Sequence, residues 1–497
     1  MCGLVASIVI LIIGGILVIG TNLVGFLAIP ALIKSEVTDQ VILKNDTAQM
    51  DRFKEVPFVL NMKVRMFSIS NPEETLNGGV PIVTEVGPYV YRLYQSRNIS
   101  EFEEDTVTYR RLEYFEFDAE AIIQIAEQSY PQLLGILDSA LEQVFREHNK
   151  PITTYRVGDV IKDGVPFCTN PRLVGLIACA AIRLIGQDSQ NIAERPDRSL
   201  EFSAIGYRQG IPSPEYKVVR GFNDVADLGR IIELDQMPHF EQWTNIQHES
   251  NATKTSVCNM INGTDSGIFA PFVDRKEKIY AVNTDICRSI ELRYEYDSEV
   301  LGVPTARFAA KEWLLDNDDG CFCINVTTGI NRENGCLFRG AMEIQSCVGA
   351  PLVLTNPHFL YADPIYRSNI FGMMPVEDDH RIYIDIETNT GTPLRGAKRG
   401  QFNIFMRSVE GITGTQTLRT SLTPFLWVEE SFILPEKLAD ELKSSLLNTL
   451  RIIDIVVPVV IAISCVILVV GLVLTVLNVR KKSTVPTTIT AVPPAAR

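Results

Sequence analysis

Two long apolar stretches without a charged residue lie near the two ends of the 497-residue chain. The first runs from Leu4 to Ile33, and the second covers 455–479 and is followed by Arg480-Lys481-Lys482. Each is longer than the ~20 residues with which a helix crosses the bilayer core. The pattern therefore predicts transmembrane helices at 4–33 and 453–479, and a large domain at 34–452 between them.

The residues that flank these stretches predict their orientation. A cleaved signal peptide is the alternative for the first one, but its apolar part far exceeds the usual ~7–15 residues and no basic residue precedes it. Basic residues after the second stretch mark that end as cytoplasmic. Two spans return the N-terminus to the same side, so residues 1–3 and 480–497 are predicted cytoplasmic tails. Cys2 is a candidate for palmitoylation, with a bare thiol as the alternative.

Alternation of apolar and polar residues dominates the domain between the spans. In PFVLNMKVRMF, residues 57–67, apolar side chains recur at every second position, which predicts a strand with one buried face. The stretch IYIDIE repeats the pattern, with three isoleucines opposite Tyr383, Asp385 and Glu387. Turns at 77–79, 87–88 and 389–391 and another strand at 401–406 are predicted from glycine, proline and asparagine clusters and from further alternation.

One region breaks this pattern. Residues 119–148 have helical spacing on both sides of Pro131, and residues 171–186 begin with a proline and continue almost wholly apolar. The 171–186 helix is either plain core or an apolar face near a ligand entrance. The fold class is thus predicted to be α+β, with a helical insertion in one β-rich body.

Charge distinguishes the same region from the rest of the chain. The whole protein carries a formal charge of −14, whereas residues 146–183 hold six basic residues against three acidic ones, a balance of +3. Such cations attract anionic ligands, for example fatty-acid carboxylates or phospholipids. A solvated surface of mixed charge is the alternative.

Cysteines and glycosylation motifs agree with an extracellular or lumenal domain. Eight of the ten cysteines lie between the spans, where an oxidising compartment favours disulfides over zinc. The five histidines are scattered without metal-binding spacing, so no metal site is predicted. Five Asn-x-Ser/Thr motifs predict N-glycosylation at Asn45, Asn98, Asn251, Asn262 and Asn325.

Signatures of catalysis are missing from the sequence. There is no G-x-S-x-G elbow, P-loop or dinucleotide-binding glycine motif, and the stretch 316–320 fails the spacing of a calcium loop. Two-span ecto-nucleotidases need a phosphate-binding loop that 264–268 does not supply. Two-span ion channels need a more polar pore lining than these spans offer. We predict no catalytic residue, no cofactor and no nucleic-acid partner.

Several specific strings resemble the class B scavenger receptor family of lipid receptors, in the same order and from the first span to the second. Within that family, two features look like the arthropod sensory neuron membrane proteins, which assist the detection of lipid-like pheromones. They are the two-cysteine segment that follows TTYRVGDVIKDG (153–164), with Cys168 and Cys179 eleven residues apart, and the string VVRGFNDVADLG (218–229). Members that act in phagocytosis or lipid uptake remain the alternative. The strings are NPEETLNGGVPIVTEVGPYVYR (71–92), CNMINGTDSGIFAPFV (258–273), DICRSIELRYE (285–295), CFC (321–323), GAPLVLTNPHFLYADP (349–364) and HRIYIDIETNTGTPL (380–394).

The resemblance implies a fold and a set of disulfides. The family fold is an antiparallel β-barrel-like body with a helical apex, here about 119–186, and an internal apolar tunnel that leads toward the bilayer. Spacing alone leaves fifteen connectivities open for six cysteines. The family pattern implies the pairs Cys258–Cys321, Cys287–Cys347 and Cys323–Cys336, and we extrapolate a fourth pair, Cys168–Cys179.

The resemblance also implies a function. Relatives use an apical lysine in ligand capture, which points to Lys150 and, less directly, to Arg146. We expect a plasma-membrane receptor that binds hydrophobic small molecules or lipids and transfers them to the bilayer or to a neighbouring receptor. Odorant receptors and ligand carrier proteins are the expected protein partners.

Overall fold

The chain folds into two compact units, which we call the helical unit and the β unit. The helical unit consists of Met1–Gln40 and Glu436–Arg497, and the β unit consists of Val41–Pro435. The computed structural model describes residues 2–118, 133–134, 154–169, 176, 179–180, 182–183, 191–243, 257–316, 322–325, 327–409 and 414–483.

The helical unit contains two long apolar helical segments, Gly3–Val41 and Glu436–Lys481, each long and apolar enough to cross a membrane. The predicted spans at 4–33 and 453–479 lie inside them, and helical structure continues beyond the apolar residues. The exact membrane boundaries stay a prediction. The helices are α1 (Cys2–Leu23), α2 (Ile29–Val41), α11 (Glu436–Leu442) and α12 (Asn448–Ser483), with π-helical turns at Val24–Ala28 and Lys443–Leu447.

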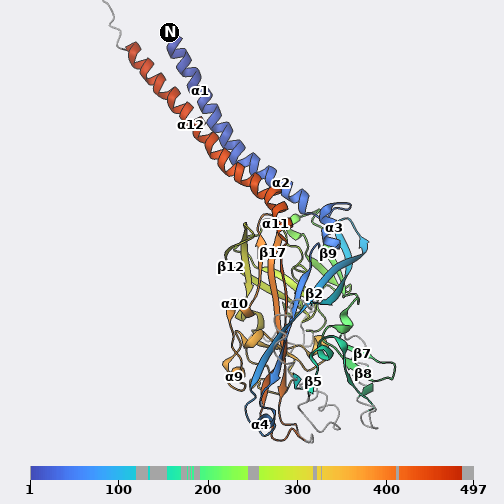
Figure 1. The fold of residues 1–497 in the computed structure, drawn as a ribbon. Helices are drawn as coiled ribbons and strands as arrows, with labels where there is room; N and C mark the ends of the chain where they lie inside the picture. Colours follow the sequence, from blue (N-terminus) through green and yellow to red (C-terminus); the bar gives the residue numbers. More distant parts are fainter. Residues whose placement is uncertain are drawn as a thin grey trace, which may run out of the picture. The chain divides into compact units, whose positions relative to one another are not determined.

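Helices α1 and α12 pack closely side by side (Figure 1). Glycines allow the close approach: a Cβ atom added to Gly14 would lie 2.6 Å from the Cα atom of Leu468. A Cβ atom on Gly471 would likewise lie 2.6 Å from the backbone nitrogen of Leu11. Small residues are the usual way for helices to pack in a bilayer, where burial of apolar surface gives no driving force.

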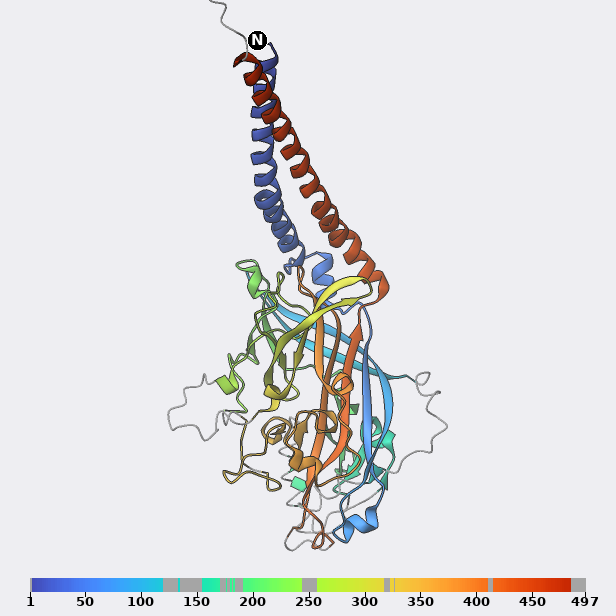
Figure 2. The same ribbon diagram turned by 90° about the vertical axis from the view of Figure 1, so that its left-hand side faces the viewer.

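The β unit is built on one large antiparallel sheet, whose long strands are seen in Figures 1 and 2. Its strands are hydrogen-bonded in the order β10-β9-β3-β2-β1-β18-β17-β16-β13-β12-β11, and the pair β14-β15 adds to β17. They are β1 (Leu60–Ile69), β2 (Val83–Phe102), β3 (Thr106–Phe117), β9 (Glu215–Val219), β10 (Ile231–Leu234), β11 (Ile279–Asn283), β12 (Arg288–Val300), β13 (Val303–Ala310), β14 (Ala341–Glu343), β15 (Val353–Thr355), β16 (Ile382–Glu387), β17 (Thr392–Met406) and β18 (Ser421–Ile433).

A short segment joins the two edge strands, β10 and β11, and so closes the barrel. The Ile231 N–H in β10 donates to the carbonyl oxygen of Gly263 at 2.9 Å. Next to it, the carbonyl oxygen of Thr264 accepts from the Val282 N–H of β11 at 2.8 Å. Gly263 has φ +96°, and a Cβ atom there would collide with the carbonyl of Tyr280, so this seam requires glycine.

The alternation predicted for residues 57–67 is confirmed. In β1, Leu60, Met62 and Val64 are buried, and the intervening side chains are only partly so. The prediction for β16 is only half right. Its isoleucines are buried, but Asp385 and Glu387 on the opposite face are buried as well, at 0% and 1% exposure.

Ion pairing and turn formation explain why two carboxylates of β16 can be buried. Asp385 accepts hydrogen bonds at 2.7 Å from Arg307 of β13 and from Arg395 of β17. Glu387 accepts from the N–H groups of Asn389 and Thr390, which fixes the predicted turn at 389–391. Both faces of this strand are therefore covered, because the charges on the second face are neutralised locally.

The turn predicted at 87–88 is wrong. Gly87 and Pro88 lie inside β2, where the peptide bond between them is cis. The register of β2 against β1 shifts at this point, since Val64 pairs with Tyr89 whereas Met66 pairs with Val86. A bulge takes up the extra residue, and proline is tolerated at such a site because no ladder hydrogen bond is lost there.

Most of the predicted helical apex lies outside the described residues. Within 171–186, the described residues are helical. The helix predicted across 119–148 is wrong at Leu133–Leu134, which form β4 and pair with β5 (Thr154–Tyr155). Pro131 just upstream lacks the N–H that a continuing helix needs. A small separate sheet consists of β6 (Val165–Phe167), β7 (Ile192–Glu194) and β8 (Leu200–Phe202).

Short helices connect the strands. Helix α3 starts at a Thr47 cap whose hydroxyl accepts from the Met50 N–H at 3.2 Å. The short α-helices of the β unit are α3 (Ala48–Lys54), α4 (Pro72–Leu76), α8 (Gln345–Val348), α9 (Pro364–Arg367) and α10 (Glu377–His380). The 3-10 turns are Gly206–Arg208, Val225–Asp227, Val257–Asn259, Glu312–Leu315 and Pro357–Phe359. A π turn, η2, covers Asp159–Asp163.

Candidate functional site

One face of the sheet is lined by an apolar cluster, and we call it the inner face. Val64 of β1 pairs with Val428 of β18 and with Tyr89 of β2, so these three side chains project to the same side. Phe115 of β3 and Ile404 of β17 belong to the same cluster, although three strands separate them in the sheet. A cluster that joins strands so far apart is expected on the concave side of a curved sheet, where side chains converge.

Several members of this cluster are only partly buried. They include the aromatic side chains of Phe58, Tyr89, Phe402 and Phe432, of which Phe58 and Phe432 contact each other with ring centroids 5.9 Å apart. Partly exposed apolar side chains on a concave face are a favourable surface for an apolar ligand. We call these partly buried side chains the apolar strip. It follows β1, β17 and β18, and Phe432 brings it to the end of β18.

The π turn η2, which lies within the predicted apex region, packs onto the inner face. Val160 and Ile161 of η2 are fully buried in the apolar cluster. Their carbonyl oxygens accept from the N–H groups of Ala204 and Ile205 at 2.9 Å. This part of the predicted apex region is therefore in contact with the apolar cluster.

A network of six charged side chains lies next to the apolar cluster on the inner face. Lys398 of β17 pairs with Asp285 at 2.9 Å and with Glu430 of β18 at 3.6 Å. Asp285 also pairs with Arg208 at 2.8 Å. Arg208 continues the network to Glu113 of β3 at 3.5 Å, and Arg111 is 3.1 Å from the same carboxylate. Three positive and three negative charges balance.

The pKa values of the acidic members follow from this arrangement. Burial opposes the ionised form of Asp285, but the nearby charges of Arg208 and Lys398 outweigh it and hold the pKa of Asp285 far below its usual value. Burial is likewise outweighed at Glu113, whose pKa is lowered by Arg111 and Arg208. Asp285 and Glu113 therefore stay ionised at neutral pH.

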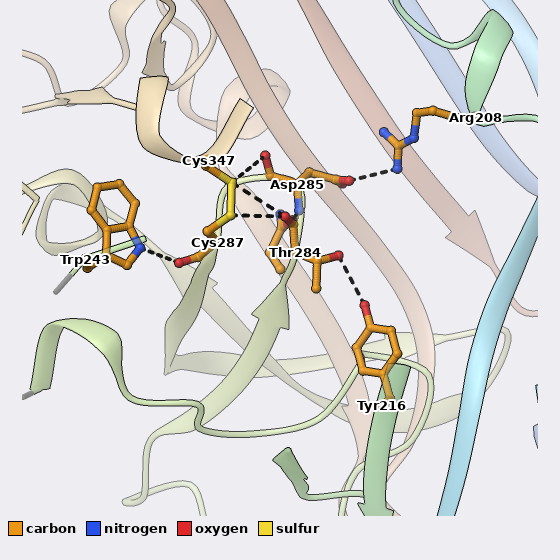
Figure 3. Close-up of a disulfide and its surroundings, with 8 residues drawn as sticks. Arg208, Tyr216, Trp243, Thr284, Asp285, Cys287 and Cys347 are labelled. Carbon is orange, nitrogen blue, oxygen red and sulfur yellow. Dashed lines mark hydrogen bonds and ion pairs between the residues drawn. A yellow bond between two sulfur atoms is a disulfide. The ribbon is translucent and has the colours of Figure 1, made fainter. Parts of the chain in front are cut away.

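A disulfide fixes the loop that carries Asp285 (Figure 3). Cys287, two residues after Asp285, is bonded to Cys347. The Trp243 indole N–H donates to the carbonyl oxygen of Cys287, and the hydroxyl groups of Tyr216 and Thr284 are 3.2 Å apart. Figure 3 shows Asp285 held in this frame with its carboxylate directed to Arg208.

The opposite face of the same strands carries a second set of charges. Glu429 of β18 accepts from Lys63 of β1 at 2.7 Å and from Arg399 of β17 at 2.8 Å. Burial raises the pKa of Glu429, but Lys63 and Arg399 outweigh it and lower that pKa to about 2. Alternate positions of β18 thus send Glu429 outward and Glu430 inward.

The predicted capture residues Lys150 and Arg146 lie outside the described residues and stay a prediction. The structure contains the disulfides Cys168–Cys179, Cys287–Cys347 and Cys323–Cys336. Cys258 is disulfide-bonded, whereas its predicted partner Cys321 lies outside the described residues.

Four of the five predicted glycosylation sites lie in the described part of the chain. Asn45, Asn98 and Asn325 are exposed and Asn262 is half-buried, while Asn251 is outside the described residues. Glycosylation itself stays a prediction. In the described ranges, no group of three or more His, Cys, Asp or Glu side chains is placed to hold a metal ion.

The charged network was missed by sequence reasoning. Its members come from strands and loops scattered from position 111 to position 430, and each looks like an ordinary surface charge in its own segment. The nearest signal was the string DICRSIELRYE, which contains Asp285 and Cys287 but was noted only for its family resemblance.

Comparisons with known proteins agree with this architecture. The family model described as CD36 family matches residues 12–475. Sensory neuron membrane protein 2 of Drosophila melanogaster is 31% identical over 507 residues, covering 87% of this chain and 90% of the relative. Sensory neuron membrane protein 1 of Manduca sexta is 30% identical, covering 87% and 84%. With its two apolar helical segments and large antiparallel β unit, the chain belongs to the CD36 family, the class B scavenger receptors, and is a membrane receptor with two spans.

Proposed function

We propose that this receptor binds hydrophobic, lipid-like ligands and passes them along the inner face of the β unit to the membrane or to a neighbouring receptor. Chemosensation is the proposed setting, because the relatives above are named sensory neuron membrane proteins. Lipid or lipoprotein uptake, or phagocytosis, is the alternative within the same family. Expression restricted to chemosensory cells favours the first role, and expression in phagocytes or gut favours the second.

The observation that carries the proposal is the strip of partly buried apolar side chains on the inner face. Each exposed methylene of a long-chain ligand costs about 0.8 kcal/mol in water. A continuous apolar surface lowers that cost during transfer, and no covalent bond has to be made or broken. The role therefore needs no catalytic residue.

The remaining parts of the proposal concern capture and topology. The locally basic 146–183 segment, with Lys150 and Arg146, would attract anionic ligands before they enter. Both termini would lie in the cytoplasm and the glycosylated β unit outside the plasma membrane. A carrier protein or an odorant receptor is the proposed partner for loading or delivery.

A bulky substitution on the strip tests the proposal. Val428→Trp adds an indole to the inner face beside Val64, whereas Val59→Trp makes the same change at a side chain that is 38% exposed. Full-length protein in liposomes is loaded with a fluorescent long-chain alcohol from a carrier, and the rate of transfer is measured.

We expect Val428→Trp to slow transfer strongly while Val59→Trp leaves it near the wild-type rate. Correct folding of both variants is checked by their thermal unfolding. If Val428→Trp folds and transfers the alcohol as fast as Val59→Trp does, ligands do not use this face.

For the capture step, Lys150→Glu should weaken binding of a fatty-acid anion more than binding of the matching alcohol. An equal loss for both ligands would remove the electrostatic role of Lys150.

A further inference from the structure

Two stacked histidines lie in contact with the 371–376 loop, away from the inner face. The imidazole rings of His358 and His380 are 4.4 Å apart and nearly parallel. His358 belongs to the 3-10 turn Pro357–Phe359 and His380 ends α10. Both residues are buried, with exposures of 6% and 7%. Histidines of this kind are often only satisfied core residues, so their hydrogen bonds decide what they can do.

Both imidazoles accept a hydrogen bond from the backbone of the same loop. The Met374 N–H donates to Nδ1 of His358 at 3.2 Å, and the Val376 N–H donates to Nδ1 of His380 at 2.9 Å. An imidazole nitrogen accepts a hydrogen bond only while it carries no proton. Protonation of either Nδ1 atom would place its new N–H against the backbone N–H of the loop, and the hydrogen bond between them would be lost.

The other ring nitrogen of His358 is hydrogen-bonded to a carboxylate. Its Nε2 lies 2.6 Å from Oε2 of Glu85, which also accepts from the Trp427 indole N–H at 2.7 Å. Nε2 of His358 therefore faces the Glu85 carboxylate, and Nδ1 is the nitrogen that accepts from the loop. Its backbone N–H donates to the buried Gln401, which fixes the ring position.

The titratable and charged groups around His380 come from five elements. Glu85 of β2 and Asp379 of α10 favour its protonated form, whereas His358 and Arg399 of β17 oppose it. Arg65 of β1 stands over the Trp427 ring, which in turn packs edge-on against His380. Burial has the largest effect and, with His358, lowers the pKa of His380 to about 4.

The loop itself carries apolar side chains in unusual exposure. Phe371 is 58% exposed, Met374 73% and Val376 47%, while Met373 packs against the buried cluster around Phe359. The Phe371 end is tied to β2, because Val83 N–H donates to the Phe371 carbonyl oxygen at 2.9 Å. Between that anchor and α10, the two imidazole acceptors hold the backbone of the loop.

We propose that the 371–376 loop is an acid-released strap: protonation of the histidine pair breaks its two N–H to imidazole hydrogen bonds and frees an apolar segment from the β unit. Two adjacent imidazoles with their acceptor nitrogens turned to one loop are the observation that supports this. The released segment would carry Met373 away from the cluster around Phe359.

The expected size follows from linkage. When the loop leaves, His380 becomes accessible to water and its pKa rises toward the ordinary 6.5, whereas in the closed state its pKa is about 4. The closed state is fully stable above pH 6.5 and loses stability as the pH falls toward 4, because the released state binds the proton more tightly. At pH 5, a full return of His380 to that ordinary pKa would shift the equilibrium toward release by about 30-fold, which is the upper limit of its effect.

Hydrogen–deuterium exchange on the full-length protein in nanodiscs tests this proposal. Peptides spanning 371–380 are compared at pH 7.5 and pH 5, with correction for the intrinsic pH dependence of exchange. We expect the exchange rate of the loop amides to rise at pH 5, by up to about 30-fold. Peptides from β17 should keep their protection, because release is local.

Two variants locate the response. His380→Asn keeps an oxygen acceptor near the position of Nδ1 but does not titrate, so its loop should stay protected at pH 5. His239→Asn changes a buried histidine outside the pair and should respond to pH like the wild type.

Wild-type loop amides that exchange equally at both pH values would overturn the proposal, as would a loss of protection throughout the β unit. A His380→Asn protein that retains the full pH response would also overturn it. If that variant does not fold, the wild-type comparison alone still decides.

Discussion

Replacing Asp385 by alanine should destabilise the β unit more than any change to an exposed carboxylate. Asp385 has no exposed surface, and it accepts two hydrogen bonds at 2.7 Å from Arg307, whose side chain is 10% exposed. Arg395 donates a third at 2.7 Å. Removing the carboxylate leaves two guanidinium groups without their counter-charge, and one of them is almost fully buried. Breaking a buried pair in this way costs about 3–5 kcal/mol.

The thermal shift can be worked out from the size of the unit. Unfolding entropy is about 2.1 cal/mol/K per residue, so for the residues from Val41 to Pro435 a loss of 4 kcal/mol lowers Tm by about 5 °C. The control is Asp378→Ala, since Asp378 pairs with Arg381 at 3.0 Å but its side chain is 84% exposed. A surface pair contributes about 0–1 kcal/mol.

Thermal unfolding of both variants is followed on the full-length protein in detergent. We expect Asp385→Ala to lower Tm by several degrees and Asp378→Ala by about one degree or less. Equal Tm values for the two variants would refute the reasoning, because burial would then make no difference to the contribution of a paired carboxylate to the free energy of unfolding.

Three further predictions concern the barrel seam, acid stability and the membrane helices. Gly263→Ala should lower Tm by several degrees, because φ +96° and the carbonyl of Tyr280 exclude a Cβ atom, whereas Gly158→Ala should change Tm little. Glu429→Gln should lower the free energy of unfolding by roughly 3 kcal/mol at pH 7. In acid titrations the difference in unfolding free energy between this variant and the wild type should shrink from pH 4.5 and vanish near pH 2. The reason is that the stability due to a lowered carboxylate pKa is lost as the pH falls. Gly14→Leu should destabilise the helical unit by about 1–3 kcal/mol in detergent. Gly20→Leu should have little effect, because Gly20 has open space around it. Equal effects of the two substitutions would rule out the close helix contact.

Local patterns predicted the elements whose surroundings are simple. The two spans are long and uniformly apolar, so no tertiary contact is needed to recognise them. Strand β1 has one buried face and one partly exposed face, which is the arrangement that a period of two reports. The turn at 389–391 also has its own chemistry, because Glu387 caps its N–H groups from within the same segment.

Prediction failed where a second layer covers a strand. Asp385 looks like a solvent-facing residue in IYIDIE, and only the arginines of β13 and β17 make its burial possible. Gly87-Pro88 looks like a turn because its composition is typical of one. A bulge opposite β1 accommodates it inside a 20-residue strand instead, which depends on the register of two strands and not on either sequence alone.

The same limit applies to the site. The apolar strip was partly predictable, since the alternating apolar residues of β1 already define one of its sides. The charged network was not, because Lys398 and Asp285 are 113 residues apart and Arg208 and Asp285 are 77 apart. A buried charge is tolerated only when its partner is in place, so its position reflects the folded partner and leaves no mark in the surrounding sequence. In β18, Glu429 and Glu430 are adjacent and chemically identical, yet one faces outward to Lys63 and the other inward to Lys398. Which of the two borders the apolar strip is decided by the pairing register of β18 with its neighbours, and a shift of one residue would exchange them.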